Sequence, residues 1–505
     1  PARAGAPDER AEAPSDPSPD RRRANAPRPR LLFVTSEIAD YLKVGGLGEV
    51  SASLPRALAK VSDAHVLVPG YRAILARHPD MRIVGRLPGL ADIPPAELGE
   101  IVTADGLRIH TVLSQSLFDR AGSAYGDESG APWEDNDLRF ARLALAAAQM
   151  ARGLTGHAWR PDILHLNDWP SALAAGYLEW QGIRTPSILT VHNLAYQGNF
   201  ARERMESLAI PRSAFSIDGV EFHGQVSFLK AGLYYASQIT TVSGRYAEEI
   251  TTPDLGCGLD GLLRARRREG RLSGILNGID ESWHPRTDPN LPHPFDASDL
   301  SGKQSNAQQL REQFGLAVTR GPLFAVVSRL VHQKGLDLTL AAMESIVRDG
   351  GQLMVIGTGD AEMEQALQET ATRLPGSVAV RIGYEEPLAR RIFAASDFLL
   401  MPSRFEPCGL SQMYAQRFAS LPIAHNTGGL GETIEDGATG FLFNEARRDA
   451  FESAIQRAKR VFDRKEILQD MRRRAMNRTF GWGKAVGAYM NVYRLALGAS
   501  RQWTV

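Results

Sequence analysis

The chain has 505 residues, of which 43% are hydrophobic, and its 58 Lys and Arg residues balance 58 Asp and Glu residues. At roughly 150 residues per domain this length predicts two to four domains, and the zero net charge gives no support for nucleic acid or a membrane surface as a partner. The two cysteines form no disulfide framework, and no apolar run approaches the ~20 residues of a membrane-spanning helix.

Residues 1–30 are rich in Pro, Ala, Arg and acidic residues, and they lack the apolar core of a secretory signal. We therefore predict a disordered tail. The acidic residues of this tail, which plastid transit peptides avoid, are Asp8, Glu9, Glu12, Asp16 and Asp20. A cytoplasmic location is expected, and a plastid location is the less favoured alternative.

From Leu31 onward, short apolar runs alternate with helical patterns. Strands are predicted at 31–37, 65–70, 162–168, 186–193 and 238–243. A strand followed by a helix, repeated several times, predicts a parallel sheet with crossover helices.

A turn-rich stretch at 271–285 interrupts this pattern, which then restarts. Further strands are predicted at 322–330, 352–359, 378–384, 397–403 and 421–426, and a helical segment of mixed charge runs on to about Met476. The sequence therefore predicts an α/β fold of two doubly wound domains joined near 271–285. Ligands bind at the carboxyl ends of strands in such sheets, so we expect the site in the cleft between the domains.

The stretch YLKVGGLGEV, residues 41–50, lies where the first predicted strand gives way to a helix. Gly45 and Gly46 allow backbone amides to approach a ligand, the helix start adds a positive dipole end, and Lys43 adds a full charge. Together they suit an anion such as a phosphate. The alternative is a tight turn with a surface lysine. The P-loop motif GxxxxGK[ST] does not occur here. The dinucleotide-binding motif GxGxxG is also missing, which argues against a Rossmann oxidoreductase.

A second pair of cations lies in VVSRLVHQKGLD, residues 326–337. Arg329 and Lys334 follow a predicted strand on a loop that enters a helix. An Arg fork and a compact Lys charge that converge there would neutralise a diphosphate leaving group. The alternative is two surface charges near a helix start.

A third segment, MPSRFEPCGLSQMYA, spans residues 401–415. Glu406 is predicted to point into the cleft and to accept hydrogen bonds from sugar hydroxyls. The amides of Gly409, Leu410 and Ser411 begin a helix and suit a phosphate. Cys408 is predicted to be a small buried residue that packs in the core. The alternative for Glu406 is a carboxylate that only complements the helix dipole.

Two further strand ends carry polar residues that are candidates for the same site. Asp168 and His192 each follow an apolar strand directly. Each alone has a structural alternative, but their position at two neighbouring strand ends favours a site. Asn277, in ILNGID, has the alternative of a turn cap.

Taken together, these and further segments resemble the glycogen and starch synthases of glycosyltransferase family 5 over about residues 31–495. The segments are SEIADYLKVGGLGEV, DRAGSAYGDESGAPWEDNDLRFA, HNLAYQGNF, FHGQVSFLKAGLYYASQITTVS, ITTPDLGCGLDGLL, GILNGIDESWHP, VVSRLVHQKGLDL, MPSRFEPCGLSQMYA and NTGGLGETIEDGATGF. The resemblance implies a GT-B fold, in which two Rossmann-like domains face each other across a deep cleft. It also implies transfer of glucose from ADP-glucose to the 4-hydroxyl at the non-reducing end of an α-1,4-glucan, with retention and with no metal or other cofactor.

The resemblance also assigns roles to residues and segments of this chain. Catalytic roles fall to Glu406, His192, Asp168, Lys334 and Arg329. Substrate binding falls to Lys43, Gly45, Gly46, Asn277, Tyr384, Cys408, Gly409, Leu410 and Ser411, with Tyr384 where an aromatic stacks on adenine. The expected segments are 1–30 as the tail, 31–273 as the acceptor-side domain, 274–479 as the donor-side domain, and 480–505 as a helix that returns to the first domain.

Departures from the family pattern leave some alternatives open. HLNDWPSAL has Asn167 and Pro170 where the family usually has histidines, and HNTGGL has His425 and Asn426 where basic residues are common. UDP-glucose as donor, a small acceptor, and a catalytically silent glucan-binding homologue remain as alternatives, and the oligomeric state is open. No carboxylate is placed for a double displacement, which favours attack on the face that the leaving group departs from.

Overall fold

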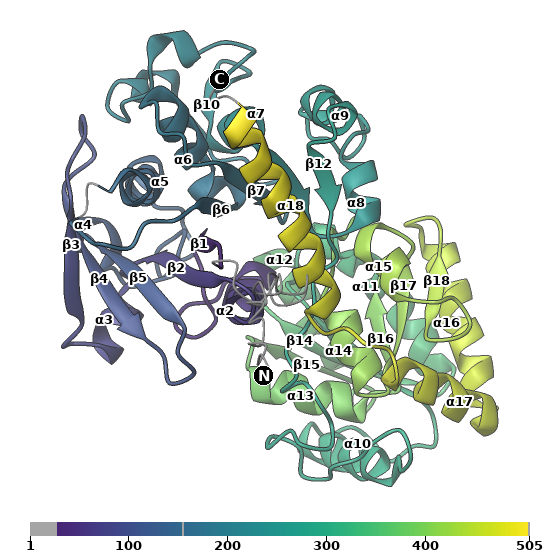
Figure 1. Cartoon of the computed structure of the whole chain (residues 1–505). Helices are drawn as coiled ribbons and strands as arrows, with labels where there is room; N and C mark the ends of the chain where they lie inside the picture. The colour runs from purple at the N-terminus through teal and green to yellow at the C-terminus, as the bar shows by residue number, and fades with distance from the viewer. Residues whose placement is uncertain (1–27, 154–155, 503–505) are drawn as a thin grey trace, which may run out of the picture.

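The computed structural model describes residues 28–153 and 156–502 (Figure 1). The predicted tail, 1–30, lies outside these residues except for its last three positions. Two separate main sheets carry the fold, and helices pack against both of them. None of the helices described is long and apolar enough to cross a membrane.

Within the described residues the first sheet has nine strands in the order β12-β11-β7-β6-β1-β2-β5-β4-β3. The strands are β1 (Arg30–Val34), β2 (Asp63–Pro69), β3 (Arg82–Leu87), β4 (Ala96–Val102), β5 (Arg108–Leu113), β6 (Ile163–Asn167), β7 (Ser187–Val191), β11 (Gln238–Thr241) and β12 (Leu272–Gly274). The pairings β3–β4 and β4–β5 are antiparallel and the others are parallel. A small antiparallel sheet of β8 (Asn199–Phe200), β10 (Gln225–Ser227) and β9 (Glu221–Phe222) accompanies it.

The second sheet, as far as the structure describes the chain, has six parallel strands in the order β15-β14-β13-β16-β17-β18. They are β13 (Leu323–Val327), β14 (Gln352–Gly357), β15 (Val378–Ile382), β16 (Phe398–Met401), β17 (Leu421–His425) and β18 (Phe441–Phe443). Every residue of β13, β14 and β16 is buried, because a parallel sheet is covered on both faces.

The helices of the first half are α2 (Gly46–Ala59), α3 (Arg72–Arg77), α4 (Gln115–Phe118), α5 (Asn136–Arg152), α6 (Asp168–Trp180), α7 (Phe228–Tyr235), α8 (Gly244–Glu249) and α9 (Asp260–Arg268). Those of the second half are α10 (Ser301–Gln313), α11 (Leu336–Arg348), α12 (Ala361–Arg373), α13 (Glu386–Ala395), α14 (Ser411–Arg417), α15 (Gly428–Thr433), α16 (Arg448–Phe462), α17 (Lys465–Met476) and α18 (Gly483–Gln502). Short 3-10 turns are η1 (Arg202–Met205), η2 (Arg212–Ala214) and η3 (His332–Lys334).

The predicted doubly wound α/β architecture is confirmed, with local corrections. The antiparallel extension β3–β5 was not predicted, the turn-rich stretch 271–285 contains the short edge strand β12, and the helical segment that ends at Met476 is two helices, α16 and α17. The order of strands reverses twice. The chain leaves β1 toward β2 and returns on the other side at β6, and it leaves β13 toward β14 and returns at β16.

The last helix, α18, contacts β6, β7 and β11 of the first sheet, although α17 before it contacts α14 and β17 of the second lobe (Figure 1). A buried polar contact holds it there: Tyr493 Oη lies 2.8 Å from His165 Nδ1. The other ring nitrogen of His165 lies 2.7 Å from Thr190 Oγ1. Both His165 and Tyr493 are buried, so each polar atom depends on this partner.

Replacing Tyr493 with Phe tests this anchor. Tyr493→Phe leaves His165 Nδ1 buried without its partner, and we expect it to lower the free energy of unfolding by about 1–3 kcal/mol. Urea unfolding followed by tryptophan fluorescence measures the change. The control is Arg494→Ala on the same helix, because Arg494 is exposed and bonds only to Asn491. Equal stability of Tyr493→Phe and the wild type would show that this contact does not hold the helix.

Candidate active site

The residues predicted from the sequence lie where the order of strands reverses in the two sheets. Asp168 directly follows β6, beside β1, and the loop after β1 carries Lys43. Arg329 follows β13, and Glu406 lies in the loop after β16, which is the neighbour of β13. Adjacent strands whose crossovers leave in opposite directions open a crevice at their carboxyl ends. Each sheet therefore brings its candidate residues to one such position.

Asp168 and His192 contact each other across the paired strands β6 and β7. Asp168 Oδ1 accepts a hydrogen bond from the backbone amide of His192 at 2.7 Å. Asp168 has a φ of 52°, a left-handed conformation that Asp tolerates better than most residues. Burial raises the pKa of Asp168 to about 7, although the amides of His192 and Asn193 oppose the rise. Burial lowers the pKa of His192 to about 3, so its ring is neutral near pH 7.

Lys43 approaches the second lobe from the loop between β1 and α2. Its ammonium forms an ion pair with Glu49 and lies 5.1 Å from the centre of the Tyr384 ring. Burial alone would lower the pKa of Lys43, but the charge of Glu49 and other neighbours raises it overall. Lys43 is therefore a protonated lysine at the boundary between the lobes.

The backbone amide of Gly45 is already occupied in this structure. Buried Glu37 accepts from Val44 N at 2.7 Å and from Gly45 N at 3.0 Å, and it also accepts from Tyr125 Oη at 2.6 Å. The Gly45 amide therefore donates to Glu37 in this conformation, and its contact with a ligand stays a prediction. Gly46 begins α2, so its amide is among the free donors of that helix start.

Lys334 and Glu406 form a short ion pair within the second lobe. Lys334 Nζ lies 2.5 Å from Glu406 Oε2, and Ser403 Oγ donates to the same oxygen at 3.0 Å. The side chains of Lys334 and Glu406 are 17% and 8% exposed, so this pair is largely removed from water. Gly335 allows the two loops to meet, because a Cβ there would lie 2.0 Å from Pro402 O. Its φ of 67° also favours glycine.

The segment 408–411 forms the start of α14 beside this pair. Cys408 is buried, as predicted, and burial raises the pKa of its thiol to about 12, so it is not a nucleophile. Gly409 has a φ of 72°. Ser411 is the first residue of α14, and its hydroxyl lies 3.4 Å from Val327 O at the end of β13.

Three contacts join residues of the two lobes, and a fourth joins Asn277, just after β12, to Cys408. Besides the Lys43–Tyr384 contact, Arg329 Nη1 donates to Tyr196 Oη at 3.0 Å. A Cβ on Gly46 would lie 3.9 Å from Leu410 Cδ1, and the backbone of Asn277 hydrogen-bonds to Cys408. Asn277 is buried, and its side-chain oxygen has no hydrogen-bond partner within the described residues. These contacts place Lys43, Gly46, Arg329, Tyr384 and the 408–411 segment between the sheets, while Asp168 and His192 lie at neighbouring strand ends of the first sheet.

Three residues of this region were not predicted as site residues: Glu37, Tyr196 and Ser403. Nothing in the sequence predicts the role of Glu37, because its carboxylate meets the amides of Val44 and Gly45 only when the loop between them has folded. Tyr196 lies in HNLAYQGNF, a segment already noted, but nothing in the sequence places it opposite Arg329. Ser403 is the last residue of the predicted strand 397–403, and its position at that strand end is a signal that could have identified it.

A second set of contacts fixes the lobes to each other at α8 and α15. Arg245 donates to Asn426 Oδ1 at 2.5 Å and to Asn426 O at 2.6 Å. Glu249 Oε1 accepts from the amide of Gly428 at 2.9 Å, and Ser243 Oγ donates to Pro407 O at 2.6 Å. The loop that carries Glu406 is thus bonded to the first lobe one residue after the catalytic candidate.

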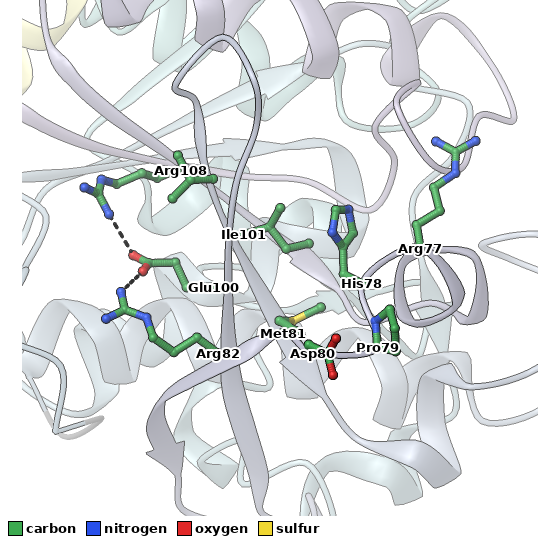
Figure 2. A pocket seen from close by; sticks show the side chains of 10 residues that line it. Arg77, His78, Pro79, Asp80, Met81, Arg82, Glu100, Ile101 and Arg108 are labelled. Atoms are coloured by element: carbon green, nitrogen blue, oxygen red, sulfur yellow. Dashed lines mark hydrogen bonds and ion pairs between the residues drawn. The ribbon is translucent and has the colours of Figure 1, made fainter.

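A pocket on the outer part of the first sheet is separate from this region (Figure 2). Its lining includes Arg77, His78, Arg82, Glu100 and Arg108, with buried Glu100 held between Arg82 and Arg108. Arg108 is the first residue of β5, so this wall lies at the amino end of a strand that runs parallel to β2. The candidate active site, in contrast, lies at the carboxyl ends of strands.

The parts of the chain that the structure describes hold no group of three or more His, Cys, Asp or Glu side chains arranged to bind a metal ion. Two cations, Lys43 and Arg329, contact the opposite lobe, and Lys334 is paired with Glu406 within the second lobe.

Comparison with known proteins identifies the family of this chain. Residues 30–265 match the starch synthase catalytic domain, and residues 307–478 match the glycosyl transferases of group 1. The glycogen synthase of Pseudomonas putida is 54% identical over 472 residues, which cover 94% of this chain and 91% of that protein. Glycogen synthase 1 of Bradyrhizobium diazoefficiens is 54% identical over 455 residues, or 90% and 98% of the two chains. The chain belongs to the glycogen synthase family.

Solved structures confirm the GT-B fold expected of a glycogen synthase family member. The catalytic domain of starch synthase IV from Arabidopsis thaliana, bound to ADP and acarbose, matches with a TM-score of 0.84 at 30% identity, covering 94% of this chain and all of that one. Sucrose-phosphate synthase from Thermosynechococcus elongatus shares the fold with a TM-score of 0.58 at 18% identity. The chain is thus a glycosyltransferase of the glycogen synthase family, and the predictions of enzyme class and fold are confirmed.

The raised pKa of Asp168 predicts a pH-dependent stability. An exposed Asp ionises near pH 4, whereas burial raises the pKa of Asp168 to about 7. The native state therefore binds a proton more tightly than the unfolded chain, and this contribution to stability is lost as the pH rises from about 4 to 7. Asp168→Asn does not ionise, so we expect its melting temperature to rise relative to the wild type over this interval.

Melting temperatures of the two proteins between pH 4 and 8 measure this effect. Asp254→Asn, at an exposed position, is the matched control and is expected to follow the wild type. A difference between Asp168→Asn and the wild type that stays constant with pH would contradict the raised pKa.

Proposed function

We propose that the chain transfers glucose from ADP-glucose to the 4-hydroxyl at the non-reducing end of an α-1,4-glucan, with retention of the anomeric configuration. The observation that carries the proposal is the largely buried pair of Lys334 and Glu406, 2.5 Å apart in the second lobe, together with Lys43 of the first lobe, which lies 5.1 Å from the Tyr384 ring of the second. The Arabidopsis starch synthase IV domain, 30% identical over 94% of this chain, was solved with ADP and acarbose, which supports ADP in the donor and a glucan-like acceptor.

The proposed leaving group is ADP, and its departure places negative charge on a phosphate. Lys43 reaches the junction from the first lobe, and Arg329 and Lys334 reach it from the second. Cationic groups already in place where charge develops stabilise a transition state more than groups that must reorganise. These side chains supply the charge neutralisation that the metal-independent reaction proposed here requires.

The proposed glucose pocket uses the polar groups next to this pair. Glu406 retains acceptor capacity beyond its bonds to Lys334 and Ser403, since a carboxylate accepts about four hydrogen bonds. Asn277 offers a buried oxygen without a protein partner, and a buried acceptor of this kind is normally satisfied. A sugar hydroxyl would satisfy it. Asp168 and His192 complete the pocket from the first lobe.

The proposed stereochemical course is attack by the acceptor on the face from which ADP leaves. A double displacement would need a second carboxylate as nucleophile. Many related glycosyltransferases carry a second glutamate eight residues after the first. Here that position is Tyr414, a buried ring stacked on Trp283 at 3.7 Å between centroids. The departing phosphate then helps to take the proton of the acceptor hydroxyl.

The proposed division of the chain follows these roles. We assign 31–273 to the acceptor side, 274–479 to the donor side, and 480–505 to the helical segment that returns to the first domain. The packing of α18 on β6, β7 and β11 supports the last assignment for the residues that the structure describes.

Lys334→Ala tests the assignment to the diphosphate. Loss of a charge-assisted hydrogen bond costs about 1–3 kcal/mol, so we expect kcat/KM for ADP-glucose to fall roughly 5- to 150-fold. Initial rates of ADP release with glycogen as acceptor measure it. Lys459→Ala is the control, because Lys459 lies on α16 and pairs with Asp349, which directly follows α11. Unchanged kinetics in Lys334→Ala would refute the assignment.

A donor panel tests the reaction itself. With glycogen as acceptor, we expect ADP-glucose to be used at least tenfold better in kcat/KM than UDP-glucose, since the ADP-bound relative shares this fold and 30% of its sequence. Proton NMR of the product is expected to show only new α-1,4 linkages. A preference for UDP-glucose, or β-linked product, would contradict the proposed donor or the proposed retention, respectively.

A further inference from the structure

Asn167, the last residue of β6, holds the imidazole ring of His192. Asn167 Oδ1 lies 3.0 Å from His192 Nε2, and the side chain of Asn167 is fully buried. Asp168, the next residue, holds the backbone amide of His192 at 2.7 Å. The end of β6 thus fixes both the backbone and the ring of His192 at the end of β7.

The orientation of the Asn167 amide is determined by its other contacts. Its Nδ2 lies 3.0 Å from Val34 O and 3.3 Å from His165 O. Both of these partners are carbonyl oxygens, which only accept, so the NH₂ group must face them. Oδ1 then faces His192, and an amide oxygen only accepts. The proton of the neutral His192 ring therefore lies on Nε2.

The other ring nitrogen, Nδ1, is left with a lone pair. Within residues 28–153 and 156–502, no protein group hydrogen-bonds to His192 Nδ1. A neutral imidazole whose Nε2 donates presents Nδ1 as an acceptor, and a hydroxyl group is a donor that fits it.

We propose, resting on the glucosyl transfer proposed above, that Asn167 is a positioning residue that keeps His192 in the neutral Nε2–H tautomer, so that Nδ1 accepts a hydrogen bond from a hydroxyl of the transferred glucose. Asn167 itself does not touch the sugar. It acts through the ring of His192.

The charged and titratable groups around His192 leave this arrangement undisturbed. Asp168 faces its backbone amide rather than the ring. His165, on β6, is bonded to Tyr493 and Thr190, and burial holds its pKa well below the ordinary value, so it stays neutral. Glu37, in the loop after β1, accepts hydrogen bonds from Tyr125 Oη and from the backbone amides of Val44 and Gly45.

Nitrogen NMR reads the tautomer directly. In protein labelled with ¹⁵N-histidine, assigned by the signal missing from His192→Ala, we expect a His192 ring with a protonated Nε2 and an unprotonated Nδ1 between pH 6 and 8. This readout needs no donor or acceptor. A protonated Nδ1 in this interval, in the neutral or the charged ring, would overturn the proposal.

A double-mutant cycle separates positioning from a structural role. Asn167→Leu keeps the size of the side chain and removes both its amide groups, and we expect kcat/KM for the donor to fall roughly tenfold, the scale of one lost hydrogen bond. In a His192→Ala background the same change is expected to have almost no further effect, because its target is gone. The control is Asn199→Leu, since Asn199 bonds to Gln197 and not to His192.

Two failures are distinguishable in this design. If the wild type uses ADP-glucose and the losses from Asn167→Leu and His192→Ala simply multiply, Asn167 is structural and the positioning role is overturned, while the proposed function stands. If the wild type does not use ADP-glucose, the proposed donor fails instead, and the cycle run with the donor that it does use still decides the role of Asn167.

Discussion

The ion pair between Lys334 and Glu406 is the interaction on which the candidate site depends. A largely buried carboxylate without a cation would cost several kcal/mol in desolvation, so the loop after β16 is stable in this form only while the loop after β13 delivers Lys334 to it. Gly335 makes the approach possible, because any side chain there would collide with Pro402. One contact therefore joins the two loops that flank the point where strand order reverses in the second sheet.

The Lys334–Glu406 pair has hydrogen-bond donors and acceptors that it does not use. A lysine ammonium has three donors and a carboxylate has about four acceptor positions, and the pair uses only part of them. In the reaction proposed above, an incoming diphosphate would compete for the lysine, and sugar hydroxyls would add to the carboxylate. The first lobe has a cation of its own in Lys43, and its partner Glu49 keeps that lysine charged. Donor binding as proposed would then exchange internal ion pairs for pairs with the donor.

Much of the fold and of the candidate site was predictable, because the signals for them are local in the sequence. Apolar runs in the sequence mark parallel strands, and the polar residues that end them must lie at the carboxyl edge of their sheet, Asp168 and His192 in the first sheet and Arg329 in the second. Contacts set by long-range folding were not predictable. The occupation of the Gly45 amide by Glu37 depends on how the intervening loop closes, and the contact of Arg329 with Tyr196 depends on how the lobes meet. The break between α16 and α17 at 463–464 lies in a charged stretch without Gly or Pro, where no strong sequence signal ends a helix.

The return of α18 to the first sheet has a consequence for biosynthesis. The strands β6, β7 and β11 are complete by residue 241, yet the helix that covers them begins only at residue 483. A nascent chain must therefore carry this apolar surface uncovered, and His165 Nδ1 without its Tyr493 partner, while the whole second lobe is being made. The first lobe is complete only after the second has been synthesised, and transiently exposed apolar surface of this kind favours aggregation.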